Sequence, residues 1–221
     1  IRDSVHPDAP GQLVMAFSIL DDMKMPRLVS SIRLVKRGQR WQQQVRKGEL
    51  TEVDTTEEDT VSFTWQAKSL PYAVPQEAQL GARLVGLGNR MGRETLEVNG
   101  LRPGNYQLLI DGKPVGVFNH IALAKTVMLH NKHNTPQYKQ ALAVAELNRK
   151  RNNGPVRSLR NEWSQFQNFA RWQRRAKANP QDKNAAKQLA AATKQIVGMD
   201  DRVKKHEAAA KLLEDEIFKI N

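Results

Sequence analysis

The sequence predicts an α+β protein, and three features support this fold class. Apolar and polar residues alternate in several short runs between Leu28 and Phe118, with the period of a half-buried strand. The dipeptide Asp111-Gly112 separates two such runs and favours the type I′ turn of a β-hairpin. From about residue 121 onward, apolar residues recur at helical spacing to the end of the chain.

The first predicted element is a helix over residues 9–24. Asp8 is a suitable N-cap, and Pro10 fits the first turn, where a backbone N–H has no helical partner. Pro26 ends the helix. One face is strongly apolar and needs a sheet or other helices to cover it. The residues that define this face are Leu13, Phe17 and Leu20.

The segment 28–120 is predicted to be a small antiparallel β-sandwich. Short runs of period two, separated by turn residues, mark its strands. The runs are residues 28–35, 40–45, 61–65, 95–98, 106–110 and 113–118. Several short strands at close spacing are typical of a sandwich, in which alternate residues face a shared interior.

Residues 121–221 are predicted to form a basic helical region. We expect helices over 136–151, 156–178 and 182–197, and a fourth that begins near Asp200. Residues 135–221 contain 18 Lys and Arg against 9 Asp and Glu, so this region carries most of the chain's net charge of +12. Such an excess favours an acidic partner without identifying it.

Composition excludes some classes of site and structure. The chain contains no cysteine, which rules out disulfides and thiolate metal sites within it. It has no run of eighteen apolar residues, so we predict no membrane-spanning helix. No targeting segment is visible, and no cofactor is expected.

The start of the chain carries the strongest candidate for chemistry. Asp3-Ser4-Val5-His6-Pro7 places a carboxylate and an imidazole three residues apart, directly before the predicted helix. A carboxylate that accepts a hydrogen bond from one imidazole nitrogen fixes the tautomer and leaves the other nitrogen as a general base. The spacing Asp-x-x-His alone is common by chance, so the residues that follow decide its weight.

The longer string from Asp3 to Ala16, DSVHPDAPGQLVMA, resembles the final motif of the SGNH (GDSL-type) hydrolases. In that family Asp-x-x-His-Pro is followed by Asn or Asp, a small residue, a Gly and an apolar helix. The resemblance implies that Asp3 and His6 are the acid and base of a Ser-His-Asp triad. It also implies that residues 1–27 are the last loop and helix of a flavodoxin-like α/β domain, followed by β-rich and helical modules.

The family's other motifs are missing from the chain. There is no Gly-Asp-Ser-type nucleophile block and no Gly or Asn oxyanion block in the 221 residues. The resemblance therefore implies that an N-terminal part of the same hydrolase supplies them and that this chain alone is inactive. It also implies carboxylic ester substrates, with O-acetyl groups of carbohydrate favoured, and a secreted or periplasmic location.

Two weaker motifs have simpler interpretations. His120, His130 and His133 suggest a metal site, but no Cys, Asp or Glu lies nearby in the sequence, so we interpret them as solvated loop histidines. Residues 86–92 resemble a phosphate-binding loop faintly, without the strand and helix start that such a loop needs. We interpret this segment as a flexible connection between strands.

An alternative function is a non-catalytic module, in which the sandwich and the basic helices bind an anionic polysaccharide, a nucleic acid or a protein. The segment 156–178 interleaves aromatics, which stack on bases, with arginines, which bind phosphates. These residues are Trp163, Phe166, Phe169 and Trp172 with Arg157, Arg160, Arg171, Arg174 and Arg175. Because the aromatic spacing is mostly helical, we interpret the aromatics as core and the arginines as a solvated face.

Overall fold

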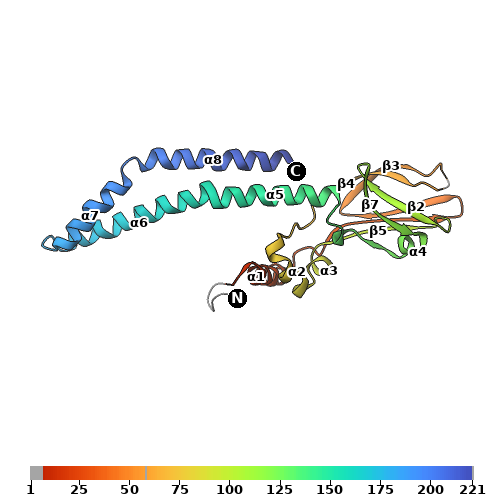
Figure 1. Ribbon diagram of the computed structural model, residues 1–221, viewed down its shortest axis with the longest axis horizontal. Coiled ribbons are helices and arrows are strands. Elements are labelled where there is room, and N and C mark those ends of the chain that lie inside the picture. The colour runs from red at the N-terminus through yellow and green to blue at the C-terminus, as the bar shows by residue number, and fades with distance from the viewer. Residues whose placement is uncertain (1–6, 58, 221) are drawn as a thin grey trace. The chain divides into compact units, whose positions relative to one another are not determined.

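A computed structural model describes residues 7–57 and 59–220 and confirms the α+β class (Figure 1). The chain divides into two compact units, residues 1–143 and 144–221. All described strands belong to the first unit, and the second unit is helical.

A four-stranded sheet with the order β2-β1-β5-β8 is the centre of the first unit. Its strands are β1 (Leu28–Arg37), β2 (Arg40–Arg46), β5 (Arg93–Asn99) and β8 (Val127–Met128). The sequence predicted antiparallel strands, but this sheet is mixed, because β1 pairs antiparallel with β2 and parallel with β5. Ile32 marks the register, since it lies opposite Val45 on one side and Leu96 on the other.

Two separate hairpins complete the β structure. They are β3 (Gly48–Asp54) with β4 (Ser62–Ala67), and β6 (Asn105–Ile110) with β7 (Lys113–Asn119). In the second hairpin Asp111 and Gly112 have φ values of 51° and 70°. Positive φ at both central residues is the requirement of a type I′ turn, so the predicted hairpin is confirmed.

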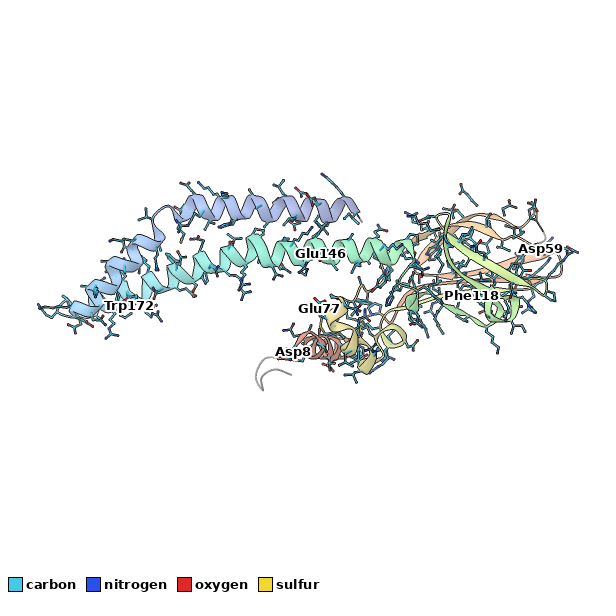
Figure 2. All side chains as sticks on the ribbon, in the orientation of Figure 1. Asp8, Asp59, Glu77, Phe118, Glu146 and Trp172 are labelled. Atoms are coloured by element: carbon cyan, nitrogen blue, oxygen red, sulfur yellow. The ribbon has the colours of Figure 1, made fainter. Side chains whose placement is uncertain are left out.

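The core of the first unit lies between the four-stranded sheet and the hairpins. Its buried side chains are Ile32, Leu34, Leu96, Val98, Leu123, Val127 and Leu129. Partly buried residues of both hairpins pack against this cluster, including Trp65 and Phe118. Phe118 is labelled in Figure 2. The short helix α4 (His120–Lys125) supplies Leu123, and the Asn119 side chain caps it by accepting a hydrogen bond from the Ala122 N–H at 2.8 Å.

The predicted first helix is present as α1 (Ala9–Asp22). It packs on η1 (Gln76–Ala78) and α2 (Gln79–Val85), which the sequence did not predict. Gly81 makes this packing close, because a Cβ at that position would overlap the backbone of Pro10. Figure 2 shows Asp8 at the start of α1 and Glu77 on the neighbouring η1.

Residues 86–92 are not the flexible connection that the sequence suggested. Gly86 ends α2 with φ of 61°, a left-handed conformation that glycine adopts without strain, and α3 (Leu87–Arg90) follows directly. Arg90 of α3 forms a 3.0 Å ion pair with Asp21, and its guanidinium lies 4.6 Å from the ring centre of Phe17. Both contacts tie α3 to α1.

The helices of the C-terminal part follow the predicted order. They are α5 (Pro136–Arg151), η3 (Asn152–Val156), α6 (Arg157–Ala178), α7 (Lys183–Ile196) and α8 (Met199–Ile220). The boundary between the units falls within α5. The predicted break at Gly154 is a kink, with φ of −95° and ψ of −105°, and the chain continues through it into α6. The chain then reverses, so that α7 packs on α6 and α8 packs on η3 and α6 (Figure 1).

None of the helices in residues 7–57 and 59–220 combines the length and the hydropathy that crossing a bilayer needs.

Candidate functional site

The two predicted catalytic residues, Asp3 and His6, lie outside the described residues. Their roles therefore stay predictions. The described chain begins at Pro7, directly after them, and enters α1 two residues later. The start of α1 is held in the first unit by the contact of Pro10 with Gly81, and its middle by buried Phe17.

The side of α1 away from these contacts exposes an apolar stripe. Met15, Ile19 and Met23 are spaced four residues apart, so they share one side of the helix, and all three are exposed. Leu80 and Leu84 on neighbouring α2 are exposed as well. A group of large apolar side chains at a helix pair is typical of a surface that another structural layer covers.

A cleft of about 200 Å³ lies in the first unit, with residues of α2 in its lining. The extended segment 71–74, helices α2 and α3, and η2 (Leu129–Asn131) form it. We call it the His130 cleft. The lining side chains that carry chemistry are Tyr72, Arg83, Asn89, His130, His133 and Tyr138.

His130 is half-buried at the back of this cleft, and so differs from the solvated histidine that we expected. Its Nδ1 lies 3.2 Å from both the backbone nitrogen and the carbonyl oxygen of Glu94, and its Nε2 lies 3.2 Å from Oδ1 of Asn89. A Cβ on Gly88 would overlap the imidazole, so glycine makes this close approach feasible. Burial lowers the pKa of His130, which favours the neutral ring at pH 7.

Glu94 lies beneath His130 on β5 and is buried. The Gln137 side-chain amide donates to its Oε1 at 3.2 Å, while its Oε2 has no hydrogen-bond partner. Burial raises the pKa of this carboxyl, and the hydrogen bonds from Gln137 and Ser30 oppose that shift only in part. The neutral carboxylic acid is therefore the form that this environment favours.

Aromatic rings form one wall of the cleft. His133 stacks on Tyr138 with ring centres 4.5 Å apart and an angle of 9° between the ring planes. Tyr72, from the extended segment, contributes a third ring and is exposed. The cleft thus combines flat apolar surface with amide, imidazole and guanidinium groups.

In the described residues the fold brings no further metal ligands to the histidines. Across residues 7–57 and 59–220 there is no group of three or more His, Cys, Asp or Glu side chains that could hold an ion. His120 is used locally instead, since its Nδ1 accepts a hydrogen bond from the Gly104 N–H at 3.3 Å.

The sequence suggested that the aromatic residues of α6 are all core, but some of them are exposed. The Trp163 side chain is 59% exposed and stacks on exposed Phe166 with ring centres 5.6 Å apart. Trp172, labelled in Figure 2, is half-buried between the guanidinium groups of Arg171 and Arg175. The arginines interpreted as a solvated face are exposed, and nucleic-acid binding through them stays the untested alternative. They are Arg157, Arg160, Arg171, Arg174 and Arg175.

Few sequence signals point to the His130 cleft. Asn89, Glu94 and His130 come from α3, β5 and η2, and only the fold brings them together. Two local signals were present. Closely spaced glycines at 86, 88 and 92 are typical of close backbone approach, and Glu94 stands beside the apolar run of a buried strand.

Comparisons with known proteins gave one informative likeness. No family model and no curated protein matches the chain. A solved structure with a similar fold is that of a gut microbial diltiazem-metabolizing enzyme, with a TM-score of 0.76 and 23% sequence identity. The match covers 99% of this chain and 53% of that enzyme, so this chain spans about half of the enzyme's length. At this identity the likeness shows the fold alone.

Proposed function

We propose that this chain is the C-terminal portion of an SGNH-type serine hydrolase that cleaves carboxylic esters. One observation carries the proposal. The Asp3-to-Pro7 motif stands directly before α1, and that helix presents an exposed apolar stripe of the kind that packs on another layer. This arrangement is what the end of an α/β domain requires.

The likeness to a solved enzyme supports the enzymatic part of the proposal. Nearly the whole chain shares its fold with about half of a protein that metabolises a small molecule. A longer protein of this kind has room for a further domain against the stripe of Met15, Ile19 and Met23. That domain would supply the serine nucleophile and the oxyanion donors.

The chemistry that we propose is acyl transfer. The serine oxygen attacks the ester carbonyl while His6 takes the serine proton and later returns it to the leaving alcohol. Asp3 accepts a hydrogen bond from the other imidazole nitrogen and holds His6 in the reactive tautomer. Water then cleaves the acyl-enzyme by the same steps, so no cofactor is needed. O-acetyl esters of carbohydrate are the substrates that we favour, in a secreted or periplasmic enzyme.

The test is hydrolysis of p-nitrophenyl acetate by the protein as encoded, including any residues that precede Ile1. Replacing His6 by Ala should lower kcat/KM by about 10³-fold or more, and Asp3→Asn by on the order of 10²–10⁴-fold. His206→Ala on α8 is the matched control and should leave the rate unchanged. Full activity of the His6→Ala variant would remove the triad assignment.

A further inference from the structure

We propose that the His130 cleft binds one sugar ring that carries a carboxylate, a ligand of the hexuronate class. The size of the cleft sets the first limit. Its volume of about 200 Å³ is below the roughly 300–1,000 Å³ of pockets that hold drug-sized ligands. One sugar ring is therefore enough to fill it.

The aromatic wall selects a flat ring with an apolar face. Tyr72, His133 and Tyr138 line the cleft; His133 stacks on the buried Tyr138 ring and, like Tyr72, is itself exposed. Carbon-bound hydrogens on one face of a sugar ring pack on such aromatic rings, as the positive edge of one aromatic ring packs on the face of another. The hydroxyl groups at the ring edge then need polar partners.

Asn89 provides such a partner. Its side chain is exposed in the cleft, and its Oδ1 lies 3.2 Å from Nε2 of His130. Its amide NH₂ is a donor suited to a ligand oxygen. Gln79 and Asn131, which also line the cleft, add further amide groups.

The charge of the cleft favours an anion. Arg83 lies in the last turn of α2 and is the cationic member of the lining, and no Asp or Glu lines the cleft. With His130 neutral, the positive charge comes from this guanidinium, which binds a carboxylate with two parallel hydrogen bonds. A neutral sugar would leave this interaction unused.

Helix α2 connects the cleft with the predicted catalytic loop. Ala82 and Arg83 face the cleft, while Gly81 packs on Pro10. Pro10 is four residues from His6, and that length of chain spans at most about 14 Å. In the hydrolase the cleft would hold an acidic sugar unit next to the esterified one. This placement rests on the proposed function, whereas the binding of the acidic sugar does not.

The experiment is an NMR titration of the ¹⁵N-labelled 221-residue chain with D-glucuronate. We expect saturable shifts of the Gly88 and Gly92 amides with a Kd of about 1–10 mM. D-glucose should bind at least about 5-fold more weakly because it lacks the carboxylate, and acetate should cause no saturable shift. Absence of shifts with glucuronate, or equal shifts with acetate, would overturn the proposal.

Paired variants locate the binding. Arg83→Gln should weaken glucuronate about 5-fold and leave glucose unchanged, because it removes only the charged contact. Tyr72→Ala should weaken both sugars. The controls are Lys125→Gln, an exposed base in the last turn of α4, and Leu84→Ala, an exposed apolar residue of α2 outside the lining. Equal effects in the controls would contradict a specific cleft.

The outcome is separable from that of the proposed function. His6→Ala should abolish ester hydrolysis and leave glucuronate binding intact, since the binding is argued from other residues, Tyr72, Arg83 and Asn89. Retained hydrolysis without sugar binding rejects the cleft alone. Sugar binding in a protein whose activity does not need His6 rejects the hydrolase alone.

Discussion

In the β-rich unit large apolar side chains fill a buried core, whereas in the described part of the helical unit the buried apolar positions belong to alanine. Leu34 has no exposed surface and packs among the branched side chains of β1, β5 and α4. In the helical unit the buried apolar residues are Ala185, Ala192 and Ala210, while Trp163 and Phe218 are exposed. The first unit therefore has a core of its own, and the second gains less from apolar burial.

An ion pair between α8 and α6 adds to the stability of the helical unit, which buries few large apolar side chains. The guanidinium of Arg202 on α8 donates two hydrogen bonds of 2.8 Å to the carboxylate of Glu162 on α6. It also donates to the carbonyl oxygens of Gln195 and Val197, where α7 meets α8. These hydrogen bonds lower the pKa of Glu162, so the pair stays ionised. The orientation of α6, α7 and α8 thus depends on the hydrogen bonds of Arg202 and on close packing of the helices at alanine positions.

The largest expected effect is in the apolar core. Replacing Leu34 by Ala should cost about 2–5 kcal/mol of unfolding free energy, because the site is fully buried and the cavity cannot refill. Urea unfolding measures it. The matched change Leu212→Ala in α8, where the side chain is 67% exposed, should stay within about 0.5 kcal/mol. Similar losses of unfolding free energy at both positions would contradict the difference in apolar burial between the two units.

A change of the opposite kind tests the close helix packing. Ala185 on α7 is fully buried, so Ala185→Leu should cost about 1–3 kcal/mol by forcing α7 away from its neighbour. Circular dichroism during thermal unfolding follows the helices directly. Ala186→Leu, at the exposed adjacent position, is the control and should be nearly neutral. If Ala185→Leu were equally neutral, the helical unit would have spare interior volume.

The smallest effect concerns the buried carboxyl in the first unit. Because burial raises the pKa of Glu94, the folded state holds this proton more tightly than the unfolded chain. Its stabilising contribution is full below the ordinary glutamate pKa and is lost as pH rises through the raised pKa. Glu94→Gln should therefore match the wild type near pH 4 and be more stable than it near pH 8.

Urea midpoints at these two pH values are the measurement for Glu94→Gln. Glu77→Gln, an exposed carboxyl on η1, controls for simple removal of charge. A Glu94→Gln variant that is less stable than wild type at both pH values would mean that the ionised carboxylate has a partner in the folded state.

The features that the sequence predicted well are local ones. Asp111-Gly112 determines a turn from two residues, and Asn179-Pro180 ends α6 without help from distant parts of the chain. Pairing of β1 with β5 joins Ile32 to Leu96 across 64 positions, and no local pattern encodes a parallel partner. The helical period of α6 identified its faces but did not show that alanines would cover one face and leave Trp163 outside.

The candidate sites divide in the same way. Asp3 and His6 were recognisable because the motif is contiguous, and their assignment stays a prediction. The pairing of His130 with Asn89 and Glu94 depends on three elements that meet only in the folded chain. Their arrangement required the structure.

The contact between Gly81 and Pro10 limits where the chain can be cut when a segment of it is transferred to another protein. A boundary after residue 27, which the sequence suggested, would separate α1 from the helix against which its first turn is packed. Any side chain larger than glycine at position 81 would displace that turn. A chimaera that transfers the β-rich unit to another protein must therefore carry α1 and α2 together, as a single inherited block.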